Sequence, residues 1–159
     1  MERRPTETEP IGMPSETVVR VGEEHLSAIA EIERLCFAEP WSETALALLL
    51  RDEARGVAVT VDGEAVAYGG MLLAFDEGQI TSVAVHPHFR RRGYGARVVR
   101  ELIALGREMG LVQLSLEVRQ SNEAAIALYE SVGFRVEGRR KRFYKFPSED
   151  ALIMLCPLT

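Results

Sequence analysis

The fold prediction rests on one stretch, Val83-Ala84-Val85-His86-Pro87-His88-Phe89-Arg90-Arg91-Arg92-Gly93-Tyr94-Gly95-Ala96. It begins with an apolar strand pattern, continues with a turn that contains proline, and ends with an Arg-x-x-Gly-x-Gly motif. A long amphipathic segment follows this motif. A helix N-terminus exposes unpaired N–H groups and about half a positive charge, which attract phosphate. Gly93 and Gly95 leave the backbone free to curl around an anion. The stretch predicts a pyrophosphate-binding loop, with an ordinary glycine turn and solvated arginines as the alternative.

A second polar pattern follows in residues 113–134. A strand over 111–119 places Glu117 on a polar stripe near the C-terminal end of the strand, where α/β proteins often bind ligands. Asn122 is predicted to cap the next helix, and Tyr129 lies two turns further on nearly the same face. The amide and the phenol would bracket an elongated ligand. The alternative is that Asn122 is only a cap, Tyr129 a core aromatic and Glu117 a solvated carboxylate.

Hydrophobic periodicity outlines the elements of a mixed α/β fold. Alternating β-branched residues predict strands over 17–21, 56–61, 65–75, 79–86, 111–119, 134–146 and 151–155. Apolar residues three or four apart predict helices over 23–37, 42–53, 95–109 and 122–132. At 159 residues and 47% hydrophobic, the chain suits one compact domain over 17–159. Residues 1–16, rich in Pro, Thr and Glu, are predicted to be a disordered tail.

Composition argues against several classes of function. The net charge of −5 disfavours a nucleic-acid partner. No apolar run has the length of a membrane span, and no signal peptide is recognised, so a cytoplasmic location is predicted. Cys36 and Cys156 have no metal-ligand spacing and do not cluster with histidines, so we expect free thiols and no metal site.

The two patterns together resemble a known family. Three parts of the sequence closely resemble the GCN5-related N-acetyltransferases (GNAT). They are the stretch over 83–96 quoted above, Leu116-Glu117-Val118-Arg119, and Ser121-Asn122-x-x-Ala125-Ile126-x-Leu128-Tyr129-x-x-x-Gly133-Phe134. The resemblance covers nearly everything after the tail. It implies the GNAT fold, an α/β fold with a central, mostly antiparallel sheet of about seven strands flanked by four helices. Within the family, Glu39-Pro40-Trp41-Ser42 and Arg139-Arg140-x-Arg142-Phe143-Tyr144 resemble the bacterial ribosomal-protein-alanine N-acetyltransferases (RimI type).

The resemblance implies a role for each residue of the predicted site. The pantetheine arm of acetyl-CoA would lie along the backbone of Val83, Ala84 and Val85. The pyrophosphate would be held by Arg91, Arg92, Gly93, Tyr94, Gly95 and Ala96, and Asn122 would also bind CoA. Glu117 would be the general base, Tyr129 the general acid, and Trp41 and Tyr144 would contact the substrate. Family members often have two adjacent tyrosines where this chain has Phe143-Tyr144.

The implied reaction is acetyl transfer from acetyl-CoA to the N-terminal α-amine of a protein, with alanine as the first residue. The implied partner is a ribosomal protein, namely the eighteenth of the small subunit. An α-amine titrates near ~8 and a thiol near ~8.5, so a carboxylate and a phenol need only modest tuning to move these protons. Three alternatives stay open: a small-molecule amine acetyltransferase of the same fold, a non-catalytic acyl-CoA sensor, and a nucleotide-binding module.

Overall fold

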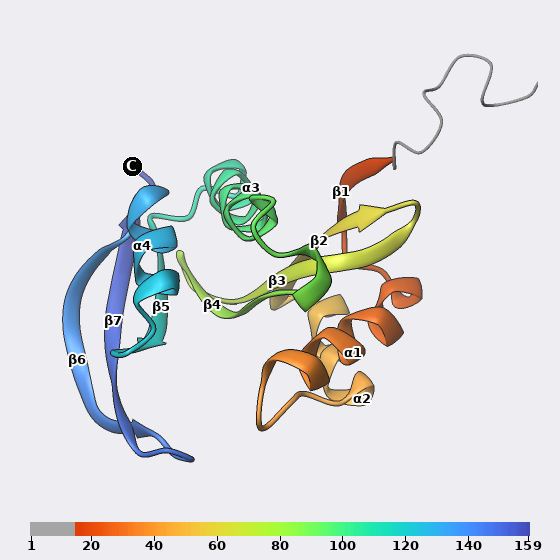
Figure 1. The fold of residues 1–159 in the computed structure, drawn as a ribbon. Coiled ribbons are helices and arrows are strands. Elements are labelled where there is room, and N and C mark those ends of the chain that lie inside the picture. Colours follow the sequence, from red (N-terminus) through yellow and green to blue (C-terminus); the bar gives the residue numbers. More distant parts are fainter. Residues whose placement is uncertain (1–14) are drawn as a thin grey trace, which may run out of the picture.

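The computed structural model describes residues 15–159, so most of the predicted tail lies outside the described part (Figure 1). The strands are β1 (Glu16–Arg20), β2 (Ala54–Val61), β3 (Glu64–Ala74), β4 (Glu77–Val85), β5 (Gln113–Arg119), β6 (Arg135–Tyr144) and β7 (Glu149–Pro157). The α-helices are α1 (Leu26–Cys36), α2 (Glu43–Leu46), α3 (Tyr94–Glu108) and α4 (Glu123–Ser131). Short 3₁₀ turns are η2 (Glu23–His25), η3 (Ala47–Leu50) and η4 (Pro87–Phe89).

All seven strands form one sheet in the order β1-β2-β3-β4-β5-β7-β6. Every neighbouring pair is antiparallel except β4 and β5, which are parallel. That parallel pairing ends at Gln79 and Ser115. Directly after it, Thr81 is an extra residue in β4 relative to β3, because Gly70 pairs with Ser82 and Met71 with Ile80. A bulge of this kind bends its strand, so β4 turns away from β5 and the sheet splits there.

Helices cover both faces of the sheet (Figure 1). The stripe of α3 formed by Val98, Val99 and Leu102 packs with strands from both sides of the split, together with apolar residues of α4. On the other face α1 and α2 pack over Ala58, Tyr68 and Ala84. This arrangement confirms the predicted mixed α/β fold with seven strands and four α-helices. In the described part of the chain, no helix has the length and hydropathy needed to cross a membrane.

Most predicted strand and helix bounds differ from the structure by one to three residues, and two of the differences concern burial or contacts. The helix predicted over 42–53 is a single α-turn, α2, that tightens into η3 and ends at Leu50. Leu46 at the end of α2 and Leu49 in η3 are buried, whereas Leu50 is exposed. The tail was predicted to reach residue 16, but Glu16 already belongs to β1, where its carboxylate accepts hydrogen bonds from Tyr94 and Arg97.

Candidate active site

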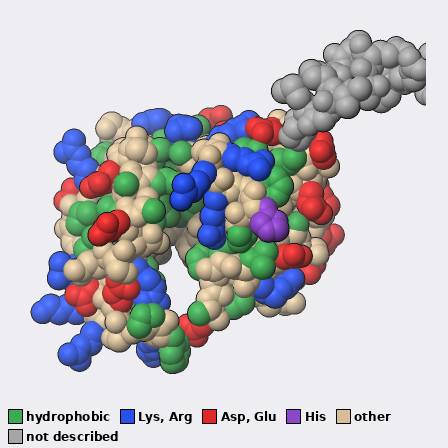
Figure 2. All heavy atoms as spheres, in the orientation of Figure 1, with side chains coloured by type: hydrophobic (Ala, Val, Ile, Leu, Met, Phe, Trp, Pro, Cys, Tyr) green, Lys and Arg blue, Asp and Glu red, His purple; other side chains and the backbone are tan. Residues whose placement is uncertain are grey.

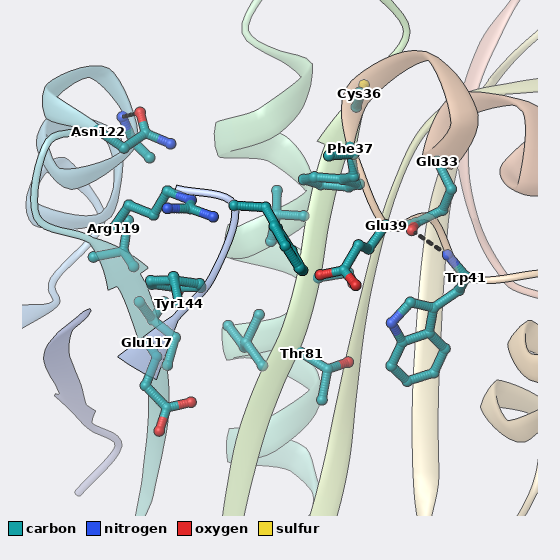
Figure 3. Close-up of a pocket in the computed structure, with 18 of the residues that line it drawn as sticks. Glu33, Cys36, Phe37, Glu39, Trp41, Thr81, Glu117, Arg119, Asn122 and Tyr144 are labelled. Carbon is teal, nitrogen blue, oxygen red and sulfur yellow. Dashed lines mark hydrogen bonds between the residues drawn. The ribbon is translucent and has the colours of Figure 1, made fainter. Parts of the chain in front are cut away.

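A cleft of about 490 Å³ opens where β4 and β5 diverge. Figure 2 shows it as an opening between the two halves of the molecule, with Lys and Arg side chains on part of its rim. In the close-up, Glu117, Arg119 and Tyr144 lie on one side of the cleft (Figure 3). Trp41 and Glu39, from the connection between α1 and α2, lie on the other side. The split in the sheet therefore brings residues from distant parts of the chain to one cavity.

Backbone groups of β4 line the cleft on the side of the split. The N–H of His86 donates to the carbonyl of Val66 at 2.8 Å, so in this antiparallel ladder Ala84 also turns its backbone toward β3. The alternate residues, Val83 and Val85, turn their N–H and C=O groups toward the gap left by β5. Of the three β4 residues predicted to contact acetyl-CoA, Val83 has its backbone edge toward the gap. The N–H of Val85 also faces the gap, but its carbonyl accepts hydrogen bonds from the Cys36 thiol and from Arg90 Nε, both at 3.4 Å. Ala84 is paired within the sheet and its side chain is buried.

The loop before α3 has the shape of an anion-binding nest. Arg91 and Gly93 both have left-handed backbone angles, with φ of 65° and 79°. The helix begins directly afterwards at Tyr94, so the N–H groups of its first turn point toward the loop. A Cβ on Gly93 would meet no atom within 4 Å, so this residue is needed for its backbone angle. The predicted run Arg91–Ala96 thus provides clustered donors next to the β4 edge.

Gly95 and Tyr94 also make contacts that the sequence analysis did not predict. A Cβ on Gly95 would lie 3.0 Å from Leu128 Cδ1 and 3.6 Å from Val85 Cγ2, so this glycine allows α3 to approach α4. Its contact with a pyrophosphate stays a prediction. The ring of Tyr94 is buried, and its hydroxyl donates to Glu16, which leaves only its backbone for a ligand.

Glu117 is held by two neighbours that the sequence analysis did not identify. Gln79 Nε2 donates to Glu117 Oε1 at 3.1 Å, and Arg140 Nε lies 2.8 Å from Glu117 Oε2. The side chain of Glu117 is 15% exposed, while that of Arg140 is 57% exposed. Gln79 and Arg140 lie far from Glu117 in the sequence, so only the strand pairing brings them together. The carboxylate is fixed in orientation at the cleft and remains reachable by water.

Tyr129 lies on α4 and Asn122 caps the start of this helix, and both line the cleft together with Glu117. Burial raises the pKa of Tyr129 to about 12, and the nearby Tyr144 contributes to the shift. The ring of Tyr129 packs on Phe134 with 5.8 Å between ring centroids. Asn122 accepts a hydrogen bond from the N–H of Ala125 at 3.1 Å, as predicted for a helix cap, and its side chain is exposed. Tyr129 is therefore a protonated phenol throughout the neutral pH range.

Glu33 is a cleft residue that the sequence analysis missed. It is 1% exposed, yet it lines the cleft, and its carboxylate accepts hydrogen bonds from the N–H of Trp41 at 2.9 Å and from the hydroxyl of Tyr68. Burial is the main reason why the pKa of Tyr68 is raised, and Glu33 adds to it. The available signal was a carboxylate on the buried stripe of α1 with Leu26, Ile29 and Ala30. Glu33 anchors the loop that carries Trp41.

Cys36 also lines the cleft, although no role was predicted for it. Its thiol donates to the carbonyl of Val85 at 3.4 Å, and Arg90 Nη2 lies 3.3 Å from the sulfur. Both Cys36 and Cys156 are free thiols. Across residues 15–159 no group of three or more His, Cys, Asp or Glu side chains is placed to hold a metal ion.

Most of the chain is similar in sequence to a known protein family. Residues 26–134 match the acetyltransferase (GNAT) family. The chain belongs to the GNAT family. One relative, the [ribosomal protein bS18]-alanine N-acetyltransferase of Salmonella typhimurium, is 38% identical over 136 residues, which cover 84% of this chain and 92% of that protein. The enzyme of the same name from Escherichia coli K12 is 36% identical over 136 residues, with the same coverage.

Solved structures agree with this family assignment. The crystal structure of the ribosomal-protein-S18-alanine N-acetyltransferase from Escherichia coli matches with a TM-score of 0.85 and 34% identity, covering 91% of this chain and 95% of that one. The Salmonella typhimurium protein yncA, whose structure contains acetyl-CoA, matches with a TM-score of 0.77 at 23% identity, a likeness of fold. These matches confirm the predicted family, the RimI-type resemblance and the assignment of the chain as an acyltransferase.

Proposed function

We propose that this GNAT protein transfers the acetyl group of acetyl-CoA to the N-terminal α-amine of a protein, with alanine as the first residue. The acceptor is a ribosomal protein of the bS18 type, and the enzyme works in the cytoplasm. One observation carries the proposal: enzymes named for this reaction are 36–38% identical to the chain over 84% of its length. The cleft between β4 and β5 supplies the chemistry that such a reaction needs.

The residues present fit acetyl-CoA. A pantetheine arm carries amides that can pair with a strand edge, and such an edge is offered by the N–H and C=O of Val83 and by the N–H of Val85, whose carbonyl already accepts from Cys36 and Arg90. The pyrophosphate would be held by the nest of residues 91–96 and the first turn of α3, and CoA would also contact Asn122 in the lining of the cleft. When bound, acetyl-CoA supplies an activated acyl group on sulfur.

Glu117 is proposed as the general base, acting through water. The amine must lose a proton to attack, and a carboxylate that is 15% exposed can accept it by way of one water molecule. Gln79 and Arg140 keep this carboxylate aimed in one direction. Arg140 also balances the negative charge of Glu117, which keeps an ionised carboxylate tolerable at a partly buried position.

Tyr129 is proposed as the general acid. The departing thiolate of CoA needs a proton, and a phenol with a pKa of about 12 is fully protonated at neutral pH. Direct transfer from sulfur to the amine forms the amide bond and releases the thiol with no acyl group on the protein. For that reason neither Cys36 nor Cys156 is given a catalytic role.

The acceptor would enter between Trp41, in the connection between α1 and α2, and Tyr144, the last residue of β6. These two residues lie at opposite sides of the cleft. Burial raises the pKa of Tyr144, and the charge of Glu117 adds to this shift, so its hydroxyl stays protonated. At neutral pH an appreciable fraction of an α-amine is neutral, whereas a lysine, with a pKa near ~10.4, is almost wholly charged. One carboxylate acting through water therefore suits an N-terminal amine better than a lysine side chain.

A competition assay tests this proposal. The acceptors are an Ala-initiated peptide, the same peptide with a blocked N-terminus and an internal lysine, and spermidine. We expect turnover to be highest on the free Ala terminus. Faster turnover on the blocked peptide or on spermidine would refute N-terminal acetylation and favour a small-molecule or lysine acetyltransferase. Acetyl-CoA binding without turnover of any amine would favour an acyl-CoA sensor.

A further inference from the structure

Arg119, the last residue of β5, makes a dense set of contacts with the loop between β6 and β7. Its Nη1 donates to the carbonyl of Pro147 at 3.0 Å and to Glu149 Oε1 at 3.2 Å. Its Nη2 donates to the carbonyl of Lys145 at 3.1 Å. The guanidinium also lies over the ring of Tyr144, 4.4 Å from its centroid. One side chain thus holds the loop at both ends and in the middle.

The same cluster reaches the start of α4. Glu149, the first residue of β7, accepts a hydrogen bond from the N–H of Ser121 through its second oxygen at 2.6 Å. Hydrogen bonds from Ser121 and then from Arg119 lower the pKa of Glu149, so this carboxylate is charged at neutral pH. We call Arg119 and Glu149 the β5–β7 clamp. It ties the loop after β5 and the loop before β7 to one another.

The clamped loop has little other support. Strands β6 and β7 pair up to Arg140 and Ala151, with a register shift between Val136 and Gly138. After a second shift they pair again only at Tyr144 and Glu149. Residues 145–148 therefore form a tip whose carbonyls at 145 and 147 are bonded by Arg119. The paired side chains are 30% and 19% exposed, so water screens this pair less than the surface pair Arg51–Glu53, at 70% and 56%.

This loop is one wall of the cleft. Tyr144, Lys145, Phe146 and Pro147 all line it. Of these, Tyr144 lies on the side opposite Trp41 (Figure 3). None of these four residues belongs to the β4 edge or to the nest that would hold acetyl-CoA. A change in the loop would therefore alter the acceptor side of the cleft directly, and it would reach the acetyl-CoA side through Glu149 and Ser121, which precedes Asn122.

We infer that Arg119 is a positioning residue for the acceptor: through the β5–β7 clamp it holds the Tyr144–Pro147 wall in the place where the acceptor amine and the segment behind it must dock. The inference rests on the proposed function for the identity of the acceptor. It assigns to Arg119 no contact with the reacting atoms. Lysine would be a poor substitute, because a single ammonium lacks the planar fork that reaches Lys145, Pro147 and Glu149 together.

The first test is kinetic and uses the full chain. For Arg119→Met we expect KM for the Ala-initiated peptide to rise about tenfold, because several hydrogen bonds from a charged group are lost. We expect kcat and the calorimetric Kd of acetyl-CoA to change less than about threefold, because the hydrogen bonds of the Arg119 side chain go to residues 145, 147 and 149 and not to the β4 edge or the nest. Arg119→Lys should give an intermediate KM. Arg51→Met, which removes the same charge from an exposed pair, is the matched control and should leave KM unchanged.

The second test measures the loop without relying on turnover. Amide hydrogen exchange over residues 143–149 should become faster in Arg119→Met and not in Arg51→Met. Unchanged exchange would overturn the clamp, and faster exchange with unchanged peptide KM would overturn its role for the acceptor. A rise in acetyl-CoA Kd parallel to KM would also overturn that role. If Arg119→Met does not fold, the exchange rates, the peptide KM and the acetyl-CoA Kd are measured on Arg119→Lys and compared in the same way.

The outcome can be separated from that of the proposed function. If the wild type prefers the blocked lysine peptide or spermidine, N-terminal acetylation fails. The KM comparison is then made with the preferred amine, and an unchanged value in Arg119→Met would overturn the positioning role. If no amine is turned over at all, the positioning role is overturned together with the proposed function. The exchange measurement alone then decides whether the clamp exists.

Discussion

At the scale of single residues, Tyr129 has the clearest consequence for catalysis. Its pKa of about 12 means that the phenol begins to lose its proton only well above the neutral range. Tyr129→Phe should lower kcat about 100-fold, which is within the usual contribution of a general acid. The ring remains to pack on Phe134, so the melting temperature should stay the same. In the wild type, the pH–rate profile should show no fall between pH 8 and pH 10. A fall in that range would contradict Tyr129 as the acid.

For Glu117, the predicted loss of kcat on substitution is largest at low pH. Glu117→Gln keeps the shape of the side chain but removes the charge that accepts a proton, so kcat should fall about 100-fold or more. The loss should be largest below pH 8, where most of the α-amine still carries its proton. Acetyl-CoA affinity, measured by calorimetry, should not change. Cys36→Ala serves as a control in the same cleft and should keep the wild-type rate. Equal rates for Glu117→Gln and wild type from pH 6 to 9 would refute the assignment.

At the scale of elements, the contact between α3 and α4 depends on Gly95. A side chain there meets Leu128 at 3.0 Å, so Gly95→Val should destabilise the protein by about 1–3 kcal/mol through overpacking. Thermal or denaturant unfolding measures this loss. The double variant with Leu128→Ala should lose less stability than the sum of the single variants, because the smaller residue makes room. If Gly95→Val keeps full stability and loses only acetyl-CoA affinity, the residue acts on the ligand and not on the helix contact.

The elements also show which features the sequence could predict. Periodicity gave the strands, the long helix α3 and the Asn122 cap, because these depend on residues close together in the chain. It did not predict that the segment over 42–53 is one α-turn followed by a 3₁₀ turn, because the spacing of Leu46 and Leu49 fits either kind of helix. Neither the divergence of β4 from β5 nor the pairing of Arg140 with Glu117 could be predicted, since both arise from strand pairing between distant residues. The resemblance to the GNAT family identified residues of the cleft such as Glu117, but it did not identify the contacts that hold them in place.

At the scale of the whole molecule, the position where the chain joins the sheet limits how far it can be shortened. Ser15 and Asp62 exchange two hydrogen bonds, from Ser15 N–H to Asp62 Oδ1 at 3.0 Å and from Asp62 N–H to the Ser15 carbonyl at 2.8 Å. Glu16 bonds Tyr94 at the start of α3, and Arg97 one turn further. The first strand therefore connects the edge of the sheet with the helix whose N-terminus would bind pyrophosphate.

Two truncations follow from these contacts. Deleting residues 1–14 should leave the melting temperature and acetyl-CoA turnover unchanged, because so polar a segment has little apolar surface to bury. Deleting residues 1–20 removes β1 and its pairing with β2, so unfolding should begin at a lower temperature. Acetyl-CoA affinity should fall as well, because Tyr94 and Arg97 lose Glu16 as a partner. Calorimetry measures both quantities on the same samples. A large loss of stability in the shorter deletion would show that residues 1–14 pack on the rest of the protein.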